Sequence, residues 1–257
     1  MFKKNNKFII CIIYCIFLFN MNIFAQGKAD CQNWYLKYNK NETQPETPDN
    51  GRYTEEYDVI SLDKSGQKNI YLTFDVGYEN GNVEKILNIL DKYNVKGAFF
   101  VLPHFIKSNP SLLQRMSTNG HLICNHTRSH RNMSEITDFN TFKKELTDNE
   151  EVLRNETGLE MAKYYRPPEG AYSEANLEFA KNSGYKTVFW SLAYADWDNN
   201  KQPDASKTLN LLLSRIHPGC VALFHPTSET NVKIMEDFIL TLKSRGYNFK
   251  SLNEFEK

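Results

Sequence analysis

From residue 68 to the C-terminus, short apolar runs alternate with longer amphipathic stretches. The apolar runs are rich in aliphatic and aromatic residues and have the length of buried strands. They predict strands at residues 69–75, 97–102, 121–126, 163–167, 186–192, 220–225 and 248–252. The amphipathic stretches have helical periodicity, and several end in glycine, which favours helix termination. They predict helices at residues 83–94, 110–120, 139–158, 174–184, 205–216 and 231–246.

Strands that alternate with helices form βαβ units on a parallel sheet. About seven such units suit a barrel-like closure better than an open, doubly wound sheet. Because no internal repeat or long linker indicates a second domain, residues 68–257 are expected to form one α/β domain. Residues 26–67 are polar and rich in turn residues. The aromatic side chains of Trp34, Tyr35 and Tyr38 are expected to pack this extension against the barrel.

The first 25 residues follow a different pattern, in which three lysines precede the apolar run 8–19. This run is shorter than the roughly 20 residues that span a bilayer, and the sequence NIFA offers a plausible cleavage position after Ala25. Residues 1–25 are therefore predicted to be a signal peptide, with an uncleaved N-terminal anchor as the alternative. In both cases the folded part is expected to be exported, and membrane contact would come only through this segment.

Composition and charge narrow the class of function. The chain has 257 residues, with 31 Lys+Arg and 31 Asp+Glu, so its formal charge is zero. Without a basic surplus, no global field favours nucleic acid or an anionic membrane surface, and nucleic-acid binding is not expected. After the first 25 residues the cysteines are Cys31, Cys124 and Cys220, and their wide spacings fit neither a zinc knuckle nor a disulfide framework. Packed free thiols are expected.

In parallel βα architectures, functional residues gather at the carboxyl ends of the strands. Alone, each ionisable residue at such an end has an ordinary structural explanation, for example turn capping for Asp75. Their joint occurrence at successive strand ends instead indicates a site. In chain order these residues are Asp75, His126 with His130, Arg166, Asp196 beside Trp197, and His225.

His126 and His130 are separated by three residues. On one helical turn, this spacing would place both imidazoles on the same face, as in the metal sites of zinc enzymes. The spacing alone is weak evidence, because surface histidines also show it by chance.

The segments that carry these residues resemble the five motifs of the polysaccharide deacetylases of the NodB-homology class, carbohydrate esterase family 4. The resemblance covers residues 68–257 and implies a distorted (β/α)7 TIM-like barrel. Within the family, the chain is most similar to the delta-lactam-biosynthetic de-N-acetylases of spore-forming bacteria, through stretches such as YLTFDVGYENG and VFWSLAYADWD. The five motifs are TFDVG (73–77), HTRSH (126–130), RPPEG (166–170), ADW (195–197) and LFH (223–225).

The resemblance implies metal-assisted hydrolysis of an amide, which requires an activated water, a stabilised oxyanion and a proton for the leaving nitrogen. Asp75 would be the general base, held ionised by Arg166, and His225 would be the general acid, with its imidazolium favoured by Asp196. The remaining roles are also implied by likeness: a divalent cation, expected to be Zn²⁺, on His126 and His130; an oxyanion contact from the backbone N–H near Glu169; and an acetyl pocket walled by Trp197 and Leu223.

Two positions depart from the family pattern. The first motif usually has two adjacent aspartates, of which the second binds the metal, and here that residue is Val76. Catalytic zinc normally has three protein ligands, so weaker metal binding is expected, and Glu79 is the alternative source of an oxygen. Because the delta-lactam subfamily also departs at this position, Val76 is interpreted as a subgroup trait. Glu169 occupies a position that is usually aromatic, which alters the pocket wall.

Together these features predict an exported enzyme that removes acetyl groups from N-acetylmuramic acid in peptidoglycan strands, as in muramic δ-lactam formation in spore cortex. Its expected location is extracellular, in the cell wall or spore envelope. One alternative is a general N-acetylglucosamine or chitooligosaccharide deacetylase, and a cation such as Arg128 near the site would favour muramic acid. The other is a metal-depleted glycan-binding protein, which Val76 favours and the retained acid, base and partner residues oppose.

Overall fold

The computed structural model describes residues 30–39 and 42–255. The predicted leader, residues 1–25, lies outside the described residues. Within the part of the chain that is described, no helix has both the length and the apolar character needed to cross a membrane.

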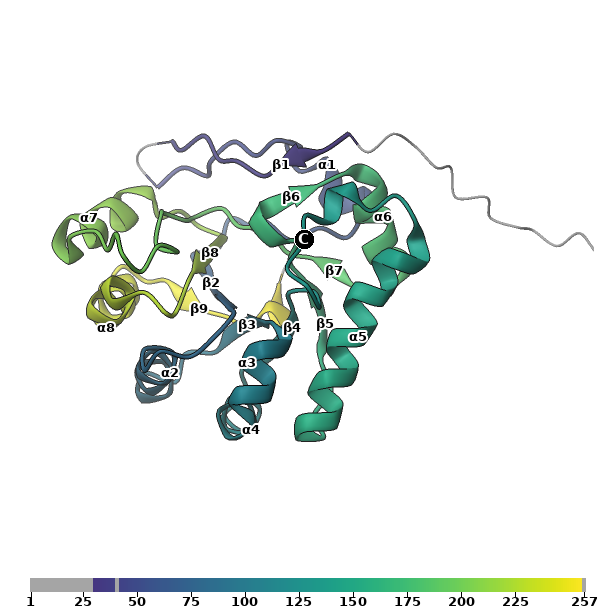
Figure 1. Cartoon of the computed structure of the whole chain (residues 1–257). Coiled ribbons are helices and arrows are strands. Elements are labelled where there is room, and N and C mark those ends of the chain that lie inside the picture. Colours follow the sequence, from purple (N-terminus) through teal and green to yellow (C-terminus); the bar gives the residue numbers. More distant parts are fainter. Residues whose placement is uncertain (1–29, 40–41, 256–257) are drawn as a thin grey trace, which may run out of the picture.

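A curled, all-parallel sheet forms the centre of the fold (Figure 1). The order across the sheet is β7-β5-β4-β3-β2-β8, and β9 pairs with the start of β2. This arrangement confirms the predicted distorted (β/α)7 barrel. The strands are β2 (Asn69–Val76), β3 (Gly97–Val101), β4 (Leu122–Asn125), β5 (Ala162–Tyr165), β7 (Lys186–Thr187), β8 (Cys220–Phe224) and β9 (Asn248–Phe249).

The barrel closes between β7 and β8 through isolated bridges instead of a continuous ladder. Val188 forms a bridge with Ile60, and Leu192 forms one with Ala222. The strand predicted at 186–192 therefore has only two residues in regular pairing. Pairing with β5 ends because Val188 N–H donates to Tyr165 O, and the next residue that would donate back to Val188 O is Pro167, which has no N–H. The carbonyl oxygens of Val188 and Phe189 instead accept hydrogen bonds from a side chain, as described below.

The six predicted helices are present, and several begin at a side chain that accepts a backbone N–H of the first turn. These N-caps are Asp138, Ser173, Asp204 and Ser228. The predicted helices are α2 (Val83–Lys92), α4 (Pro110–Thr118), α5 (Phe139–Thr157), α6 (Glu174–Asn182), α7 (Ala205–Arg215) and α8 (Glu229–Ser244). The short helices α1 (Arg52–Glu56) and α3 (Pro103–Ser108) were not predicted, because they are too short to show helical periodicity.

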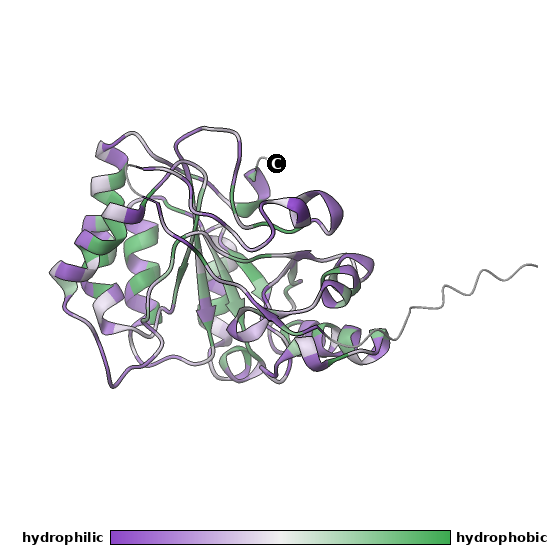
Figure 2. Cartoon of the chain, turned by 90° about the horizontal axis from the view of Figure 1, so that it is seen from above, coloured by the Kyte–Doolittle hydropathy of each residue, from purple (hydrophilic) through white to green (hydrophobic). Residues whose placement is uncertain are grey.

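Alternation along β2 divides its side chains between two layers. Leu72, Phe74 and Val76 belong to the apolar cluster that also includes residues of the surrounding helices. Tyr71 belongs to the cluster inside the barrel, and a period of two places Asp75 on this inner side as well. Figure 2 shows the hydrophobic residues concentrated in the central strands.

The segment before the barrel packs against it through Trp34 and Tyr38, whereas the contact predicted for Tyr35 is wrong, because its side chain is exposed. In this segment β1 (Gln32–Asn33) pairs antiparallel with β6 (Ala171–Tyr172). Neither of these two short strands was predicted from the sequence. Short 3₁₀ turns complete the fold: η1 (Met133–Glu135), η2 (Pro168–Gly170) and η3 (Leu252–Glu254). Cys124 and Cys220 are buried free thiols, as expected, whereas the free thiol Cys31 is exposed.

Candidate active site

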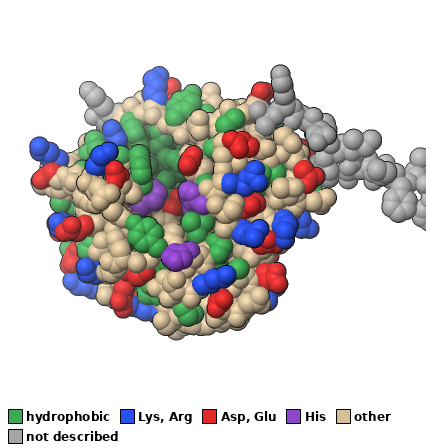
Figure 3. Space-filling view, in the orientation of Figure 1, with side chains coloured by type: hydrophobic (Ala, Val, Ile, Leu, Met, Phe, Trp, Pro, Cys, Tyr) green, Lys and Arg blue, Asp and Glu red, His purple; other side chains and the backbone are tan. Residues whose placement is uncertain are grey.

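A cavity of about 640 Å³ brings most of the predicted site residues together. Figure 3 shows histidine side chains around a hollow on this face, with an acidic side chain between them and hydrophobic side chains beside them. The lining residues are Asp75, Gly77, Tyr78, His126, His130, Glu169, Gly170, Trp190, Ala193, Tyr194, Trp197, Leu223, His225 and Thr227.

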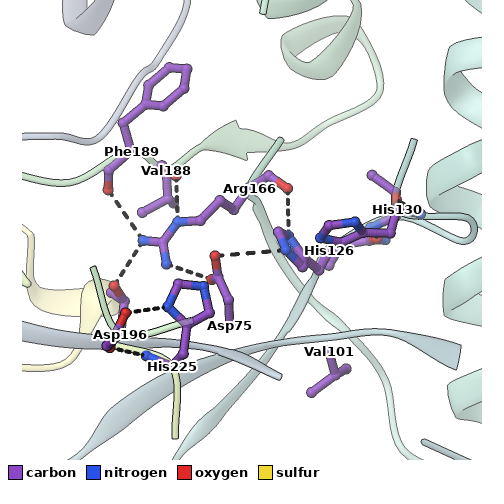
Figure 4. Close-up of polar contacts among 12 residues, drawn as sticks. Asp75, Val101, His126, His130, Arg166, Val188, Phe189, Asp196 and His225 are labelled. Atoms are coloured by element: carbon purple, nitrogen blue, oxygen red, sulfur yellow. Dashed lines mark hydrogen bonds and ion pairs between the residues drawn. The ribbon is translucent and has the colours of Figure 1, made fainter. Parts of the chain in front are cut away.

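Strand ends deliver the ionisable groups of this cavity. Asp75 is the penultimate residue of β2, and His126, Arg166 and His225 directly follow β4, β5 and β8. Because the strands are parallel, their carboxyl ends lie at the same end of the barrel. In Figure 4, Asp75 lies between His225 on one side and His126 on the other.

Asp75 is paired with Arg166, whose Nη1 lies 2.8 Å from Asp75 Oδ1. Burial by itself would raise the pKa of the Asp75 carboxyl, but the Arg166 guanidinium, together with His126 and His225, holds that pKa below its usual value. Asp75 is therefore a carboxylate at neutral pH. Its second oxygen, Oδ2, lies 3.7 Å from His126 Nε2.

Arg166 is fully buried and fixed on several sides. Its Nε donates to Val188 O at 3.0 Å, and its Nη2 donates to Thr73 Oγ1 at 2.8 Å and to Phe189 O at 3.2 Å. Each acceptor fixes the orientation of the guanidinium, so the side chain presents one nitrogen to Asp75. Thr73 is a site residue that was not predicted from the sequence. Because it precedes Asp75 by two residues on β2, its side chain lies on the same face of the strand, and this spacing could have identified it.

On the other side of Asp75, His225 is paired with Asp196. The Nδ1–H of His225 donates to Asp196 Oδ1 at 2.7 Å, and the His225 backbone N–H donates to Asp196 Oδ2 at 2.8 Å. Burial would lower the pKa of His225, but the hydrogen bond and charge of Asp196 raise it above the usual value. With Nδ1 held by Asp196, the other ring nitrogen is left for the cavity.

Asn231 orients Asp196 in turn. Its Nδ2 donates to Asp196 Oδ2 at 2.6 Å and to His225 O at 2.9 Å. Its Oδ1 accepts from Tyr194 OH at 2.5 Å. Asn231 is fully buried near the start of α8. Asn231 was not predicted from the sequence, because an asparagine near the start of a helix has no distinguishing pattern.

The helical turn predicted for His126–His130 is wrong. The segment is a loop in which Thr127 and His130 have positive φ angles of 73° and 53°. Side chains accept the backbone N–H groups that a helix would use: Asn125 Oδ1 accepts from Thr127, and Thr127 Oγ1 accepts from His130. Even so, the two imidazoles lie together, with ring centroids 5.0 Å apart.

His126 has the properties of a metal ligand. Its Nδ1–H donates to Arg166 O at 3.0 Å, so Nε2 carries the lone pair. Burial lowers the pKa of His126 to about 4, which keeps the ring neutral. Across residues 30–39 and 42–255, however, no group of three or more His, Cys, Asp or Glu is arranged to hold a metal ion. The donor set fits a cation held by two imidazoles, one protein ligand fewer than catalytic zinc usually has.

The remaining predicted residues divide into wall residues and one residue outside. Glu169 lines the cavity from η2 with a φ of 59°, and Trp197 and Leu223 also line it. Arg128 does not line the cavity. The chain turns at Thr127, and the Arg128 guanidinium lies 3.5 Å from Asp148 on α5. In this arrangement Arg128 is paired with an acidic residue of α5 and is not among the residues that line the cavity.

Glu79 does not replace the missing ligand. Its carboxylate accepts the backbone N–H of Gly81 just before α2, which makes it part of the turn that begins this helix. It is not among the residues that line the cavity.

Val76 is fully buried in the cluster between the sheet and the helices. Replacing Val76 with Asp is therefore expected to lower the unfolding free energy of the metal-free protein by roughly 2–4 kcal/mol, because a polar group would be buried without a partner. Thermal unfolding measures this loss, and Val76→Ala controls for packing without charge. If V76D unfolds like V76A and binds zinc more tightly, then the side chain at position 76 reaches the histidines.

A model of the polysaccharide deacetylase family matches residues 63–188. The chain is 39% identical to the peptidoglycan-N-acetylmuramic acid deacetylase PdaA of Bacillus subtilis, in an alignment that covers 96% of each chain.

Solved structures agree with this similarity. The structure of Bacillus subtilis PdaA, a family 4 carbohydrate esterase, superposes with a TM-score of 0.84 at 37% identity and covers 89% of this chain and 98% of that chain. A family 4 carbohydrate esterase from Bacillus anthracis has a TM-score of 0.72 at 35% identity, with coverage of 89% and 97%.

Proposed function

The chain belongs to the polysaccharide deacetylase family, carbohydrate esterase family 4, and from this membership we propose that it removes the acetyl group from N-acetylmuramic acid in peptidoglycan. Deacetylases of this family hydrolyse amide bonds of N-acetylated sugars, and the chain is an enzyme of this kind. Support for the muramic substrate comes from the near full-length similarity to PdaA. The substrate would be a glycan strand freed of its stem peptide, and the product would be available for δ-lactam formation in spore cortex.

One observation carries the catalytic assignment: two separate charge pairs, Asp75–Arg166 and His225–Asp196, face the same cavity. Each pair favours the protonation state that one proton-transfer step of the hydrolysis needs. Arg166 keeps Asp75 deprotonated, and Asp196 favours the protonated form of His225. Opposed environments of this kind separate a base from an acid within one site.

In the proposed mechanism, Asp75 accepts a proton from the water that attacks the acetamide carbon. His225 then donates a proton from its free ring nitrogen to the sugar nitrogen, since an amine leaves only when it is protonated. Asp196 compensates the imidazolium charge until the proton is transferred. The backbone N–H of Glu169 is proposed to donate to the developing oxyanion, while Trp197 and Leu223 enclose the acetyl methyl group.

His126 and His130 are the residues that would hold a divalent cation, proposed to be Zn²⁺. When bound there, such a cation would supply Lewis-acid polarisation of the acetamide carbonyl and of the attacking water. Family members are generally metal-dependent. With two protein ligands, the affinity is expected to be lower than at a three-ligand site.

We also propose that the protein is exported. A basic segment followed by an apolar run and NIFA at residues 22–25 supports a leader that directs the chain out of the cell, to the cell wall or spore envelope. That destination would place the enzyme beside its proposed glycan substrate.

A second candidate substrate is an N-acetylglucosamine residue. Among the described residues, no Lys or Arg lines the cavity. A neutral sugar needs no cation, whereas the lactate carboxylate of muramic acid would be expected to favour one. This observation keeps the glucosamine alternative open to test.

Mass spectrometry of glycan digests after incubation with the full chain tests both candidates. The proposed function requires the loss of one acetyl mass from muramic residues, and suppression of that loss by a chelator would support metal dependence. Loss from glucosamine residues alone would replace the first candidate with the second. No loss from either residue in the presence of added zinc would contradict both.

The pH dependence of kcat/KM should be a bell with distinct causes for its two limbs. Activity requires ionised Asp75 and protonated His225, so the acid limb is expected below the usual carboxyl range and the alkaline limb above pH 6.5, the usual histidine value. Asp196→Asn removes the charge that raises the pKa of His225, and it should move the alkaline limb to lower pH. An unmoved alkaline limb in D196N would assign that limb to another group.

A further inference from the structure

The segment before the family-matched region contacts the wall of the active-site cavity. The family match begins at residue 63, yet residues 34 and 38 bond to backbone atoms that line or adjoin the cavity. Figure 1 shows this N-terminal segment, in purple, passing across one end of the barrel next to β6. Its contacts are specific polar ones.

Trp34 holds two parts of the wall at once. Its backbone N–H donates to Gly170 O at 2.8 Å, and its Nε1–H donates to Trp190 O at 2.8 Å. Its indole stacks on Phe189, with ring centroids 4.2 Å apart and nearly parallel planes. Gly170 and Trp190 both line the cavity.

The contact at Gly170 leaves no room for adjustment. Gly170 has a φ of 67°, and a Cβ there would lie 2.7 Å from the Trp190 ring and 3.3 Å from Trp34 Cβ. Only glycine fits between these two side chains. Gly170 of η2, the turn that carries Glu169, thus packs directly against Trp190 and Trp34, and its carbonyl accepts from the Trp34 backbone N–H.

Tyr38 holds the next part of the wall. Its hydroxyl donates to Ala193 O at 2.9 Å and accepts from Ala193 N at 3.0 Å. The Arg215 guanidinium lies 4.1 Å from the centre of the Tyr38 ring and fixes its other side. Both backbone groups of Ala193, a cavity residue, are thus satisfied by one side chain from the N-terminal segment.

From Ala193, a continuous set of contacts leads to His225. The next residue, Tyr194, donates to Asn231, which donates to Asp196, and Asp196 accepts from His225. A shift of the backbone at residue 193 would therefore act on the hydrogen bonds that orient His225.

We propose that Tyr38 and Trp34 are positioning residues for catalysis, which hold the cavity wall and, through the segment 193–196, the orientation of the Asp196–His225 pair. This inference rests on the proposed role of His225 as general acid. It assigns to the segment before the family-matched region a function in the chemical step, beyond covering the barrel.

The test compares full-length Tyr38→Phe with wild type on glycan strands freed of stem peptides. Loss of the hydroxyl should lower kcat roughly threefold to tenfold, the effect of one or two hydrogen bonds, with KM changed less than about twofold, because His225 acts only in the transition state. Tyr35→Phe is the matched control, since Tyr35 lies in the same segment with 63% of its surface exposed, and its kcat should equal that of wild type.

A double-mutant cycle separates positioning from simple stabilisation. If Tyr38 acts through Tyr194, the effects of Y38F and Tyr194→Phe on kcat should be non-additive, and the double variant should be little slower than the slower single variant. Multiplicative effects, or a lower unfolding temperature in Y38F with unchanged kcat, would overturn the proposal. Trp34→Phe, which keeps the stacking but loses the Nε1 donor, should reproduce the loss in kcat. Inactive wild type would count against the proposed function instead of this inference.

Discussion

Replacing Asp75 with Asn is expected to lower kcat for deacetylation by roughly 10²–10⁴-fold, the range for loss of a general base. The amide cannot accept a proton from water, yet its oxygen can still accept the hydrogen bond that Arg166 Nη1 donates to Asp75 Oδ1 in the wild-type protein. The remaining acceptors of Arg166 are untouched. The variant should therefore fold and bind substrate with a KM near that of wild type.

The measurement is acetate release under saturating substrate, with circular dichroism to verify folding. Asp237→Asn is the matched control, because Asp237 is an exposed carboxylate on α8, away from the cavity. A D75N variant that retains more than about one tenth of the wild-type rate would remove Asp75 from the role of base, since general-base catalysis contributes more than that.

Replacing Arg166 with Met should have an even broader effect, on activity and on stability. The substitution leaves the Asp75 carboxyl buried without its cation, and breaking a buried pair on one side costs about 3–5 kcal/mol of unfolding free energy. Arg166 normally offsets the burial that would raise the pKa of Asp75. Without it, that pKa should rise, and the acid limb of the kcat/KM profile should move to higher pH.

Denaturant unfolding and a pH–rate profile test this expectation on the same preparation. Arg154→Met is the control, because Arg154 forms an exposed ion pair with Glu160 and such pairs contribute about 0–1 kcal/mol. If R166M does not fold, Arg166→Lys keeps the charge but loses the fork geometry, and it should show a smaller shift of the acid limb. An acid limb that stays at its wild-type position in both variants would contradict the assigned coupling.

The sequence predicted those helices and strands whose hydrophobic residues recur with a clear helical or strand periodicity. The helix at 139–158 and the strands at 69–75 and 220–225 are present within a few residues, because their apolar spacing matches their final burial. The strand predicted at 186–192 has only Lys186–Thr187 in regular pairing, because Pro167 on the neighbouring strand has no N–H to donate, and its later carbonyls bind the Arg166 guanidinium. No local pattern encodes such a long-range partner.

The candidate site was predictable where side chains follow strands. Asp75, Arg166 and His225 could be placed together because parallel strands share one carboxyl end. The conformation of the histidine loop could not be predicted, because it depends on side-chain acceptors, among them Glu145 of α5, which accepts from the Ser129 backbone N–H at 3.0 Å. Asn231 was missed, and Tyr38 was predicted only to pack against the barrel, for a similar reason: the hydrogen bonds of both residues are made with residues distant in the chain.

The interrupted pairing after β7 has a consequence for any attempt to regularise this barrel. The carbonyl of Phe189, which binds the Arg166 guanidinium, lies on the side of the strand where Phe189 N–H donates to Ile60 O. A redesign that extended the hydrogen bonding on this side would therefore take one acceptor away from the guanidinium. In this protein that oxygen solvates a buried cation instead of lengthening the sheet.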